Sequence, residues 1–380
     1  MLNSNKVVVI LGAALALALT GAQAKEPIGF LETIHHHVTL ASTVADNGDL
    51  NPYALIVAPV SAGKIHQGDV LVDNFNRISN LQGTGTTIMD YDPEKKDISL
   101  FAELPANVPG CPGGVGLSTA MVMLKSGYLI VGSTPSLDGT TRTMGPGGLL
   151  VLDANGKLVA AWANTNINDP WGNIAAIDNG SNAILFISMA GQDVPGPDVR
   201  DSQTSYPVTV RKATVLRIEL SIADGQPPVI TGQMIIADGF GQRADRDAFL
   251  VGPTGLALGP NDTLYVSDAL GNQIVAISDA STRTASAGTG TTITKDGLLK
   301  RPLALTTAPN GHLLAINALK GQVVEIDPAT GKQLYAQWID ADQAQSPPGN
   351  GDLFGIAMIP DGKGFYYVED DVNTIMKAIP

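Results

Sequence analysis

GPTGLALGPNDTLYVSDALGNQIVAI occupies residues 252–277, and RPLALTTAPNGHLLAINALKGQVVEI occupies residues 301–326. The two stretches align without gaps, and each holds an apolar strand, a turn that begins with Pro-Asn, a second apolar strand, a polar break and a third strand. A unit of three or four strands that recurs about every 50 residues is typical of a β-propeller blade. The repeat therefore predicts an all-β fold.

Fainter copies of the unit extend over the rest of the chain. Each copy opens with a short motif whose fourth place holds Gly or Ala. The six opening motifs are Asn51-Pro52-Tyr53-Ala54, Gly113-Gly114-Val115-Gly116, Asp169-Pro170-Trp171-Gly172, Gly252-Pro253-Thr254-Gly255, Arg301-Pro302-Leu303-Ala304 and Asp352-Leu353-Phe354-Gly355. Small residues suit strands that crowd a central channel. The sequence thus predicts a six-bladed β-propeller.

The last unit stops at Pro380 with three strands and lacks an outer one. At the other end of the chain, residues 34–44 form a strand-like run before the first complete unit. An open sixth blade would leave an unpaired sheet edge. We therefore expect this N-terminal strand to complete the last blade and close the ring.

The N-terminus has the pattern of a secretory signal peptide. Lys6 precedes an apolar run over 7–19, and Ala22-Gln23-Ala24 is a cleavage site of small residues. This pattern predicts a signal peptide at 1–24, a single propeller domain at 25–380 and a periplasmic or secreted protein. No later segment is apolar enough for membrane insertion.

The composition is acidic, with 23 Lys and Arg against 36 Asp and Glu and a formal net charge of −13. Such a surface repels nucleic acid and anionic lipid, so we expect no nucleic-acid partner. The chain has one cysteine, Cys111, so no intramolecular disulfide can form.

The stretch at 252–277 resembles an NHL repeat, and the chain from about residue 34 to 380 resembles the NHL-repeat six-bladed propellers. It is similar, more loosely, to the senescence-marker and gluconolactonase propellers. The second resemblance implies a divalent metal held in the channel by Glu, Asn and Asp side chains. The positions that match chemically are Asn51, Asp169, Asn317 and Glu369. Such oxygen ligands suit Ca²⁺ or another divalent cation.

In a propeller, the first strands begin and the second strands end at one face of the ring. Polar side chains at these positions converge there, and they make up the predicted ligand site. Its residues are Asn51, Asp73, Asn74, Asn76, Asp169, Trp171, Arg301 and Asp352. The alternative is that such Asp and Asn side chains only satisfy turn backbone groups. Arg301 would then pair with Asp352 or Glu369.

Long loops lie on the same face. Loops 74–85, 133–146 and 191–212 join second to third strands in consecutive blades, so we expect them to form one wall of a cleft, with 237–251 and 340–350 adding length. A neutral polar ligand would suit the Asn and Gln side chains there, with Phe75 or Trp171 as a stacking surface.

Two functions follow from these observations. The first is an exported, non-catalytic propeller that binds a small polar ligand or a protein partner at the loop-rich face. The alternative is a divalent-metal-dependent lactonase or ester hydrolase of the gluconolactonase type. An NHL-like lyase is a more distant third, and no catalytic residues are predicted.

Overall fold

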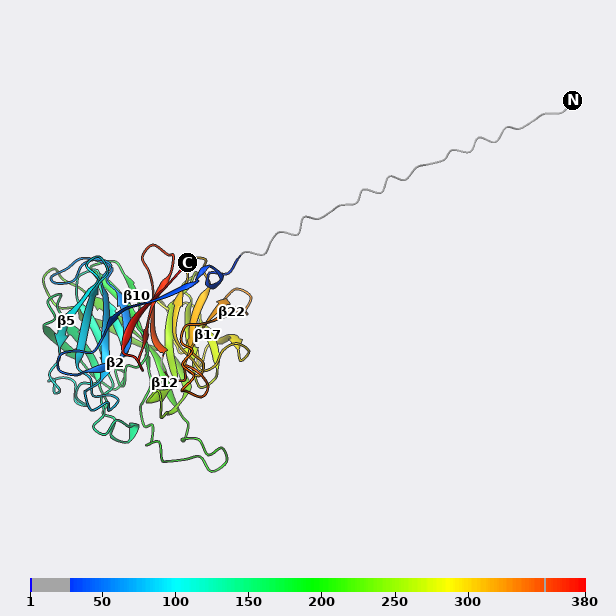
Figure 1. Ribbon diagram of the computed structural model, residues 1–380. Coiled ribbons are helices and arrows are strands. Elements are labelled where there is room, and N and C mark those ends of the chain that lie inside the picture. Colours follow the sequence, from blue (N-terminus) through cyan, green and yellow to red (C-terminus); the bar gives the residue numbers. More distant parts are fainter. Residues whose placement is uncertain (2–27, 352) are drawn as a thin grey trace.

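A computed structural model shows a ring of six antiparallel sheets (Figure 1). It describes Met1, residues 28–351 and residues 353–380. Residues 2–24 of the predicted signal peptide and Asp352 lie outside the described residues. The long loops gather at one end of the ring, and the C-terminus lies at the other end (Figure 1). The predicted six-bladed propeller is confirmed.

The first three blades follow the chain from their inner to their outer strands. Blade 1 comprises β2 (Leu50–Val57), β3 (Val70–Asn76), β4 (Thr87–Asp92) and β5 (Asp97–Glu103). Blade 2 comprises β6 (Leu117–Met123), β7 (Leu129–Ser133), β8 (Gly148–Leu152) and β9 (Leu158–Trp162). Blade 3 comprises β10 (Ala175–Asp178), β11 (Asn182–Met189), β12 (Val210–Ser221), β13 (Val229–Ala244) and β14 (Leu250–Val251).

The last three blades follow the same order. Blade 4 comprises β15 (Pro253–Leu258), β16 (Leu264–Asp268), β17 (Gln273–Ile277) and β18 (Thr291–Lys295). Blade 5 comprises β19 (Pro302–Thr307), β20 (Leu313–Asn317), β21 (Gln322–Asp327) and β22 (Lys332–Trp338). Blade 6 comprises β23 (Leu353–Met358), β24 (Phe365–Glu369), β25 (Thr374–Ile379) and β1 (His36–Ser42).

The N-terminal strand closes the ring, as expected. β1 pairs antiparallel with β25, from His36 opposite Ile379 to Ser42 opposite Thr374. The chain just before β1 is held by a buried carboxylate of blade 5 that the sequence did not single out. Glu325 accepts hydrogen bonds from the backbone N–H groups of Phe30 and Leu31, at 2.8 and 2.9 Å. The closing strand is therefore anchored to two neighbouring blades.

One expectation about blade 3 is wrong. The regular first strands of blades 2 and 3 begin at Leu117 and Ala175, and the opening motifs before them still pair with the second strands, through Gly116 with Thr134 and Pro170 with Met189. The expected loop at 237–251 is largely strand, because β13 runs on to Ala244. Its pairing with β12 shifts register four times, and such bulges bend a strand without ending it.

Aromatic side chains fill the middle of the ring. Tyr53 stacks on Phe75 and Phe354, with ring centroids 4.2 and 3.7 Å apart. It also meets Trp171 edge-on at 6.1 Å, although blades 1 and 3 are not neighbours, so this contact crosses the centre. Phe249 packs on Phe75 and Trp171. We call these five fully buried rings the aromatic plug, because they close the channel.

Glycine at the fourth place of a motif lets neighbouring blades approach the centre. A Cβ atom on Gly172 would collide with the carbonyl oxygen of Thr254 in the next blade. One on Gly255 would collide with that of Leu303. The small residues are therefore required by the packing of inner strands, as predicted.

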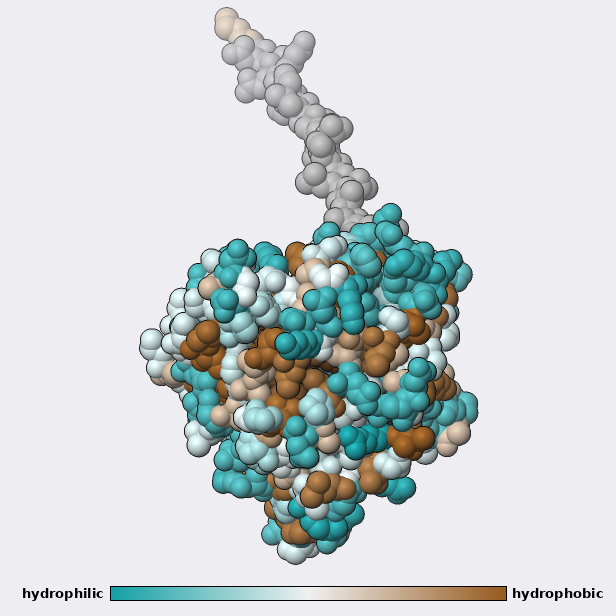
Figure 2. Space-filling model, turned by 90° about the vertical axis from the view of Figure 1, so that its left-hand side faces the viewer, coloured by the Kyte–Doolittle hydropathy of each residue, from teal (hydrophilic) through white to brown (hydrophobic). Residues whose placement is uncertain are grey.

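Helix is almost absent from the described residues. The two 3-10 turns are η1 (Leu31–Thr33) and η2 (Thr141–Thr143), and no described helix could cross a bilayer. Figure 2 shows the side of the ring that carries β5, where apolar side chains gather in the middle and hydrophilic ones dominate the upper part.

Candidate functional site

The end of the ring at which the first strands begin is walled on one side. We call this end the mouth. Loops 77–86, 134–147 and 190–209 belong to blades 1, 2 and 3, whereas the matching loops of the other blades are only 269–272, 318–321 and 370–373. The mouth is therefore lopsided, as the sequence predicted.

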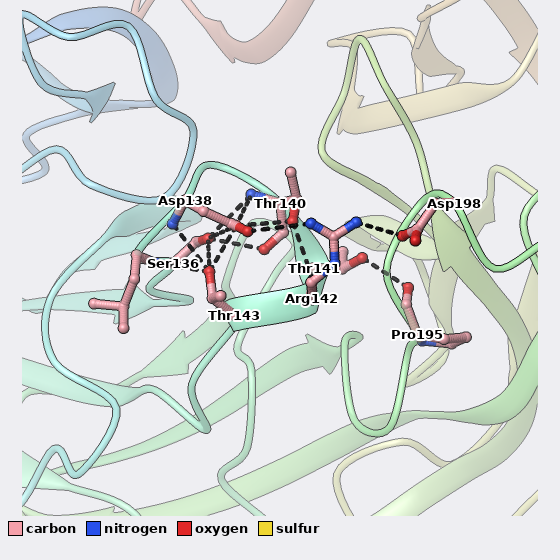
Figure 3. Close-up of polar contacts among 9 residues, drawn as sticks. Ser136, Asp138, Thr140, Thr141, Arg142, Thr143, Pro195 and Asp198 are labelled. Carbon is pink, nitrogen blue, oxygen red and sulfur yellow. Dashed lines mark hydrogen bonds and ion pairs between the residues drawn. The ribbon is translucent and has the colours of Figure 1, made fainter.

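The three long loops are bonded to one another in chain order. The backbone N–H of Ser136 donates to Gly83 O at 2.8 Å. Thr141 Oγ1 donates to Pro195 O at 2.8 Å, and the Arg142 guanidinium pairs with Asp198 at 2.5 Å (Figure 3). They form one continuous wall.

The middle loop is braced from within. Asp138 accepts hydrogen bonds from Thr143 Oγ1 at 2.6 Å and from the backbone and hydroxyl of Thr140 at 2.9 and 2.8 Å (Figure 3). Burial opposes ionisation of this carboxyl, but these hydrogen bonds hold its pKa below the ordinary value. The loop that forms the middle of the wall thus has a defined shape.

A cavity of about 600 Å³ lies beside this wall, and we call it the mouth cavity. Polar side chains dominate its lining. It is lined by Leu50, Asn51, Asn76, Asn80, Leu81, Gln82, Gly139, Arg246, Asp247, Asp370, Asp371 and Asn373. The cavity therefore combines amide groups from blade 1 with carboxylates from the short turn of blade 6.

Two buried amide oxygens of the mouth cavity accept no hydrogen bond from any described residue. They are Asn51 Oδ1 and Asn76 Oδ1. Asn51 has a left-handed backbone (φ 68°), which Asn tolerates well, and its N–H donates to Asn373 Oδ1 at 2.6 Å. Asn76 donates through Nδ2 to Asn80 Oδ1 at 2.8 Å. The backbone of Asn51 and the side chain of Asn76 are thus held in place, while the side-chain oxygen of each residue is left unsatisfied.

A smaller cavity of about 350 Å³ shares Gln82, Gly139 and Arg246 with the mouth cavity. Phe249 of the aromatic plug also lines it. The two cavities thus lie side by side on the mouth face of the plug.

Arg301 has a partner that the sequence did not suggest, while Asp352, one of its two expected partners, lies outside the described residues. Its guanidinium pairs with Asp245 at 2.8 Å, and both side chains are mostly buried. Asp245 reaches this position because β13 extends to Ala244. The sequence does carry a signal for this contact, because Asp245, Arg246 and Asp247 form a charged cluster within the expected loop and could have been considered as partners of Arg301.

Several predicted site residues brace the backbone. Asn317 accepts from the N–H of Lys300 at 2.8 Å and donates to Leu298 O at 3.0 Å. Asn74 donates to Thr43 O at 2.8 Å and to Thr87 Oγ1 at 3.0 Å. For these two residues the structure shows the backbone role that was the alternative.

Three predicted carboxyls are strongly influenced by burial. It raises the pKa of Asp73 to about 8, although the Ala54 N–H donates to its Oδ1 at 2.8 Å. Burial and the nearby Asp193 raise the pKa of Asp169 to about 8. Burial, with Asp340 and then Asp371, raises the pKa of Glu369 to about 7. Asp73 and Asp169 therefore favour the neutral acid near pH 7.

The predicted metal residues are not gathered in one cavity. Asn51 lines the mouth cavity, and Glu369 directly precedes its two lining carboxylates, Asp370 and Asp371. Asp169 and Asn317 are not among the lining residues. Trp171 and Phe75 were expected to offer a stacking surface, but both are fully buried in the plug. A metal held by the four residues together stays a prediction.

No known protein-family model matches the chain, and no curated protein matches it in sequence. Solved structures do share its fold. A gluconolactonase from Xanthomonas campestris has 12% identity and a TM-score of 0.55, over 90% of this chain and 89% of that one. Regucalcin from Agrobacterium tumefaciens, a calcium-binding protein, has 12% identity and a TM-score of 0.50, over 90% and 93%. A PQQ-bound aldose sugar dehydrogenase from Streptomyces coelicolor has 14% identity and a TM-score of 0.51, over 90% of this chain and 98% of that one.

Identity this low shows the propeller fold and not an activity. The structural neighbours include the gluconolactonase and regucalcin type of propeller, in agreement with the looser of the two resemblances. Membership of the NHL repeats, export and the ligand stay predictions.

Proposed function

We propose that the protein is a divalent-cation-dependent hydrolase that acts on a small polar lactone or related ester in the mouth cavity. The observation that carries the proposal is the pair of unsatisfied buried oxygens, Asn51 Oδ1 and Asn76 Oδ1, in a cavity that carboxylates also line. Leaving a buried acceptor unpaired costs about 1–3 kcal/mol, which a bound ligand would recover.

The donor set fits a hard cation. Ca²⁺ prefers carboxylate and amide oxygens. Asn51, Asn76, Asp247, Asp370 and Asp371 supply these, and no sulfur or imidazole lines the cavity. These residues would hold the ion, which when bound polarises a carbonyl oxygen and makes water a better nucleophile. A gluconolactonase and a calcium-binding protein are among the proteins that share the fold, so the fold is compatible with such a site.

Other lining residues have roles that need no metal. Arg246 lines both cavities, so its guanidinium is placed to stabilise negative charge that develops on a substrate oxygen. Asn80 and Gln82 offer hydrogen bonds to hydroxyl groups of a sugar-like substrate. The bonded loops of blades 1 to 3 exclude water from one side of the site.

The aromatic plug favours a second candidate, the non-catalytic binding protein. The plug fills the centre of the channel with buried apolar rings. A ligand at the mouth therefore has room beside the wall and not on the axis of the ring. A polar ligand could be held there without chemistry.

One experiment separates the two candidates. Melting temperature and hydrolysis of glucono-1,5-lactone and a panel of related lactones would be measured with Ca²⁺, Mn²⁺ or EDTA. The proteins compared are the wild type, Asp371→Asn and the matched control Asp224→Asn, which changes an exposed carboxylate at the opposite end of the ring. We expect cation-dependent stabilisation and hydrolysis that Asp371→Asn loses and Asp224→Asn keeps. Stabilisation without hydrolysis would favour the binding protein, and no effect of any cation would refute the proposal.

A further inference from the structure

The end of the channel opposite the mouth is open and apolar. A cavity of about 630 Å³ there is lined by the inner strands of all six blades. Each blade contributes side chains, such as Val57, Val122, Ala176, Leu258, Thr307 and Met358. We call this cavity the funnel.

The funnel ends at the aromatic plug. Leu55 and Ile356 line it, and each lies two places after a plug residue on its strand, Tyr53 and Phe354. The pairing with the second strand shifts register over this stretch in both blades, and the funnel begins directly beyond the plug. It is therefore closed at its inner end and open at its outer end.

Most polar groups in the funnel already have partners. The Asn173 side chain donates to Leu256 O and accepts from its N–H, at 2.8 and 2.9 Å. Thr307 Oγ1 donates to Leu258 O at 3.1 Å. Asp178 accepts from the backbone N–H groups of Lys125 and Gly180, at 2.6 and 2.7 Å. These groups satisfy the backbone and leave little for water to bind.

Lys125 is the exception. Its side chain is exposed at the funnel, and among the described residues no carboxylate forms an ion pair with its ammonium group. The funnel thus offers a mostly apolar wall, one cationic donor without an ion-pair partner in the described part of the chain, and the Asp178 carboxylate, whose two oxygens already accept backbone hydrogen bonds.

We propose that the funnel binds a small amphipathic anion, an alkyl or aryl carboxylate whose apolar body fills the cavity and whose carboxylate meets Lys125. The volume lies in the range of small-molecule sites, about 300–1,000 Å³. It would hold roughly 20 waters at about 30 Å³ each, with few polar partners for them. An apolar body that displaces this water removes apolar surface from solvent. This site is separate from the mouth cavity and does not depend on the proposed hydrolase.

The test uses decanoate, below its micelle concentration, and isothermal titration calorimetry on the wild-type protein. Decyltrimethylammonium, with the same chain and the opposite charge, serves as the comparison ligand. We expect decanoate to bind more tightly. Ala357→Phe places a ring in the funnel and should weaken decanoate binding by at least about tenfold, because the ring occupies space that the alkyl chain would fill. Ala329→Phe, in an exposed turn, is the matched control and should leave it unchanged.

Two further variants sharpen the test. Lys125→Gln should weaken decanoate binding by about two- to fivefold, the range expected for one exposed ion pair, and should leave the cation unaffected. Asp371→Asn, in the mouth, should leave decanoate binding unchanged. If Ala357→Phe does not fold, Thr306→Phe fills the same cavity from blade 5.

The proposal is overturned if decanoate does not bind to the wild type, or if a folded cavity-filling variant binds decanoate as tightly as the wild type does. Equal binding of the cation would overturn the choice of an anion. None of these results bears on lactone hydrolysis at the mouth.

Discussion

The mouth and the funnel are two ends of the same channel, yet their chemistry is opposite. The mouth holds amide and carboxylate groups, two of them buried with unsatisfied oxygens, under loops of very unequal length. The funnel is mostly apolar and nearly regular, and apart from Lys125 most of its polar side chains are bonded to the backbone.

The difference follows from place within one repeated motif. Residues at the first place, Asn51, Asp169 and Arg301, have left-handed backbones (φ 68°, 54° and 59°) at the mouth. Tyr53 and Phe354 at the third place enter the plug, and Leu55 and Ile356 two places later line the funnel. One short strand thus passes from the plug to the funnel across a register shift, while the first place lies at the mouth end of the strand or just before it.

Loss of a ring from the aromatic plug, which separates the mouth from the funnel, should lower the free energy of unfolding more than any other change considered below. Tyr53→Ala deletes a fully buried ring that stacks between Phe75 and Phe354 and touches Trp171. We expect a loss of about 3–5 kcal/mol in the free energy of unfolding, measured with urea, because the cavity cannot collapse across six blades. Trp338→Ala, at an outer strand and 41% exposed, is the control and should cost far less. A loss below about 1 kcal/mol would contradict the plug's central role.

Buried carboxyls at the mouth should make stability depend on pH. Asp73 has a folded-state pKa of about 8 against an ordinary 3.8, mainly because it is buried. Its contribution is fully present below pH 4 and is lost as pH rises toward 8, since the unfolded chain releases the proton first. The wild type should therefore lose stability over this range.

The variant Asp73→Asn isolates this residue from the other buried acids, Asp90, Asp169 and Glu369, whose pKa values are also raised. We expect the gap in melting temperature between wild type and variant to shift in the variant's favour from pH 5 to pH 8. A gap that does not change with pH would mean that Asp73 titrates normally.

The wall of the mouth should loosen locally when its internal brace is removed. Asp138→Ala deletes the hydrogen bonds that Thr140 and Thr143 donate within loop 134–147, together with an exposed ion pair to Arg142, and should cost about 1 kcal/mol. Amide hydrogen exchange should quicken in that loop and stay unchanged at the funnel. Exchange that quickens equally at both ends would show that the two regions are not independent.

The smallest change in stability is expected for an exposed ion pair between two loops of the wall. Arg142 and Asp198 form an ion pair between two loops, but their side chains are 55% and 66% exposed. A double-mutant cycle with Arg142→Ala and Asp198→Ala should give a coupling of less than about 1 kcal/mol that fades in salt. A coupling well above this would mean that the pair, and not Thr141 with Pro195, holds the loops together.

Much of the fold was readable from the chain because a propeller repeats one local pattern. Alternating apolar strands, turns at Pro-Asn and small residues at the fourth place predicted six blades, and the missing outer strand predicted closure by residues 34–44. The lopsided wall followed from the lengths of three loops. These features depend on periodicity and spacing, which a sequence carries directly.

The tertiary structure decided which polar residues face a ligand. Only contacts across the ring place Trp171 and Phe75 in a closed plug, commit Asn317 to a backbone turn, and give Arg301 the partner Asp245 from an over-long strand. The unsatisfied oxygens of Asn51 and Asn76, and the funnel built by six strands together, likewise arise from packing between distant segments. A local pattern specifies each strand, but the environment of a side chain depends on neighbours tens or hundreds of residues away.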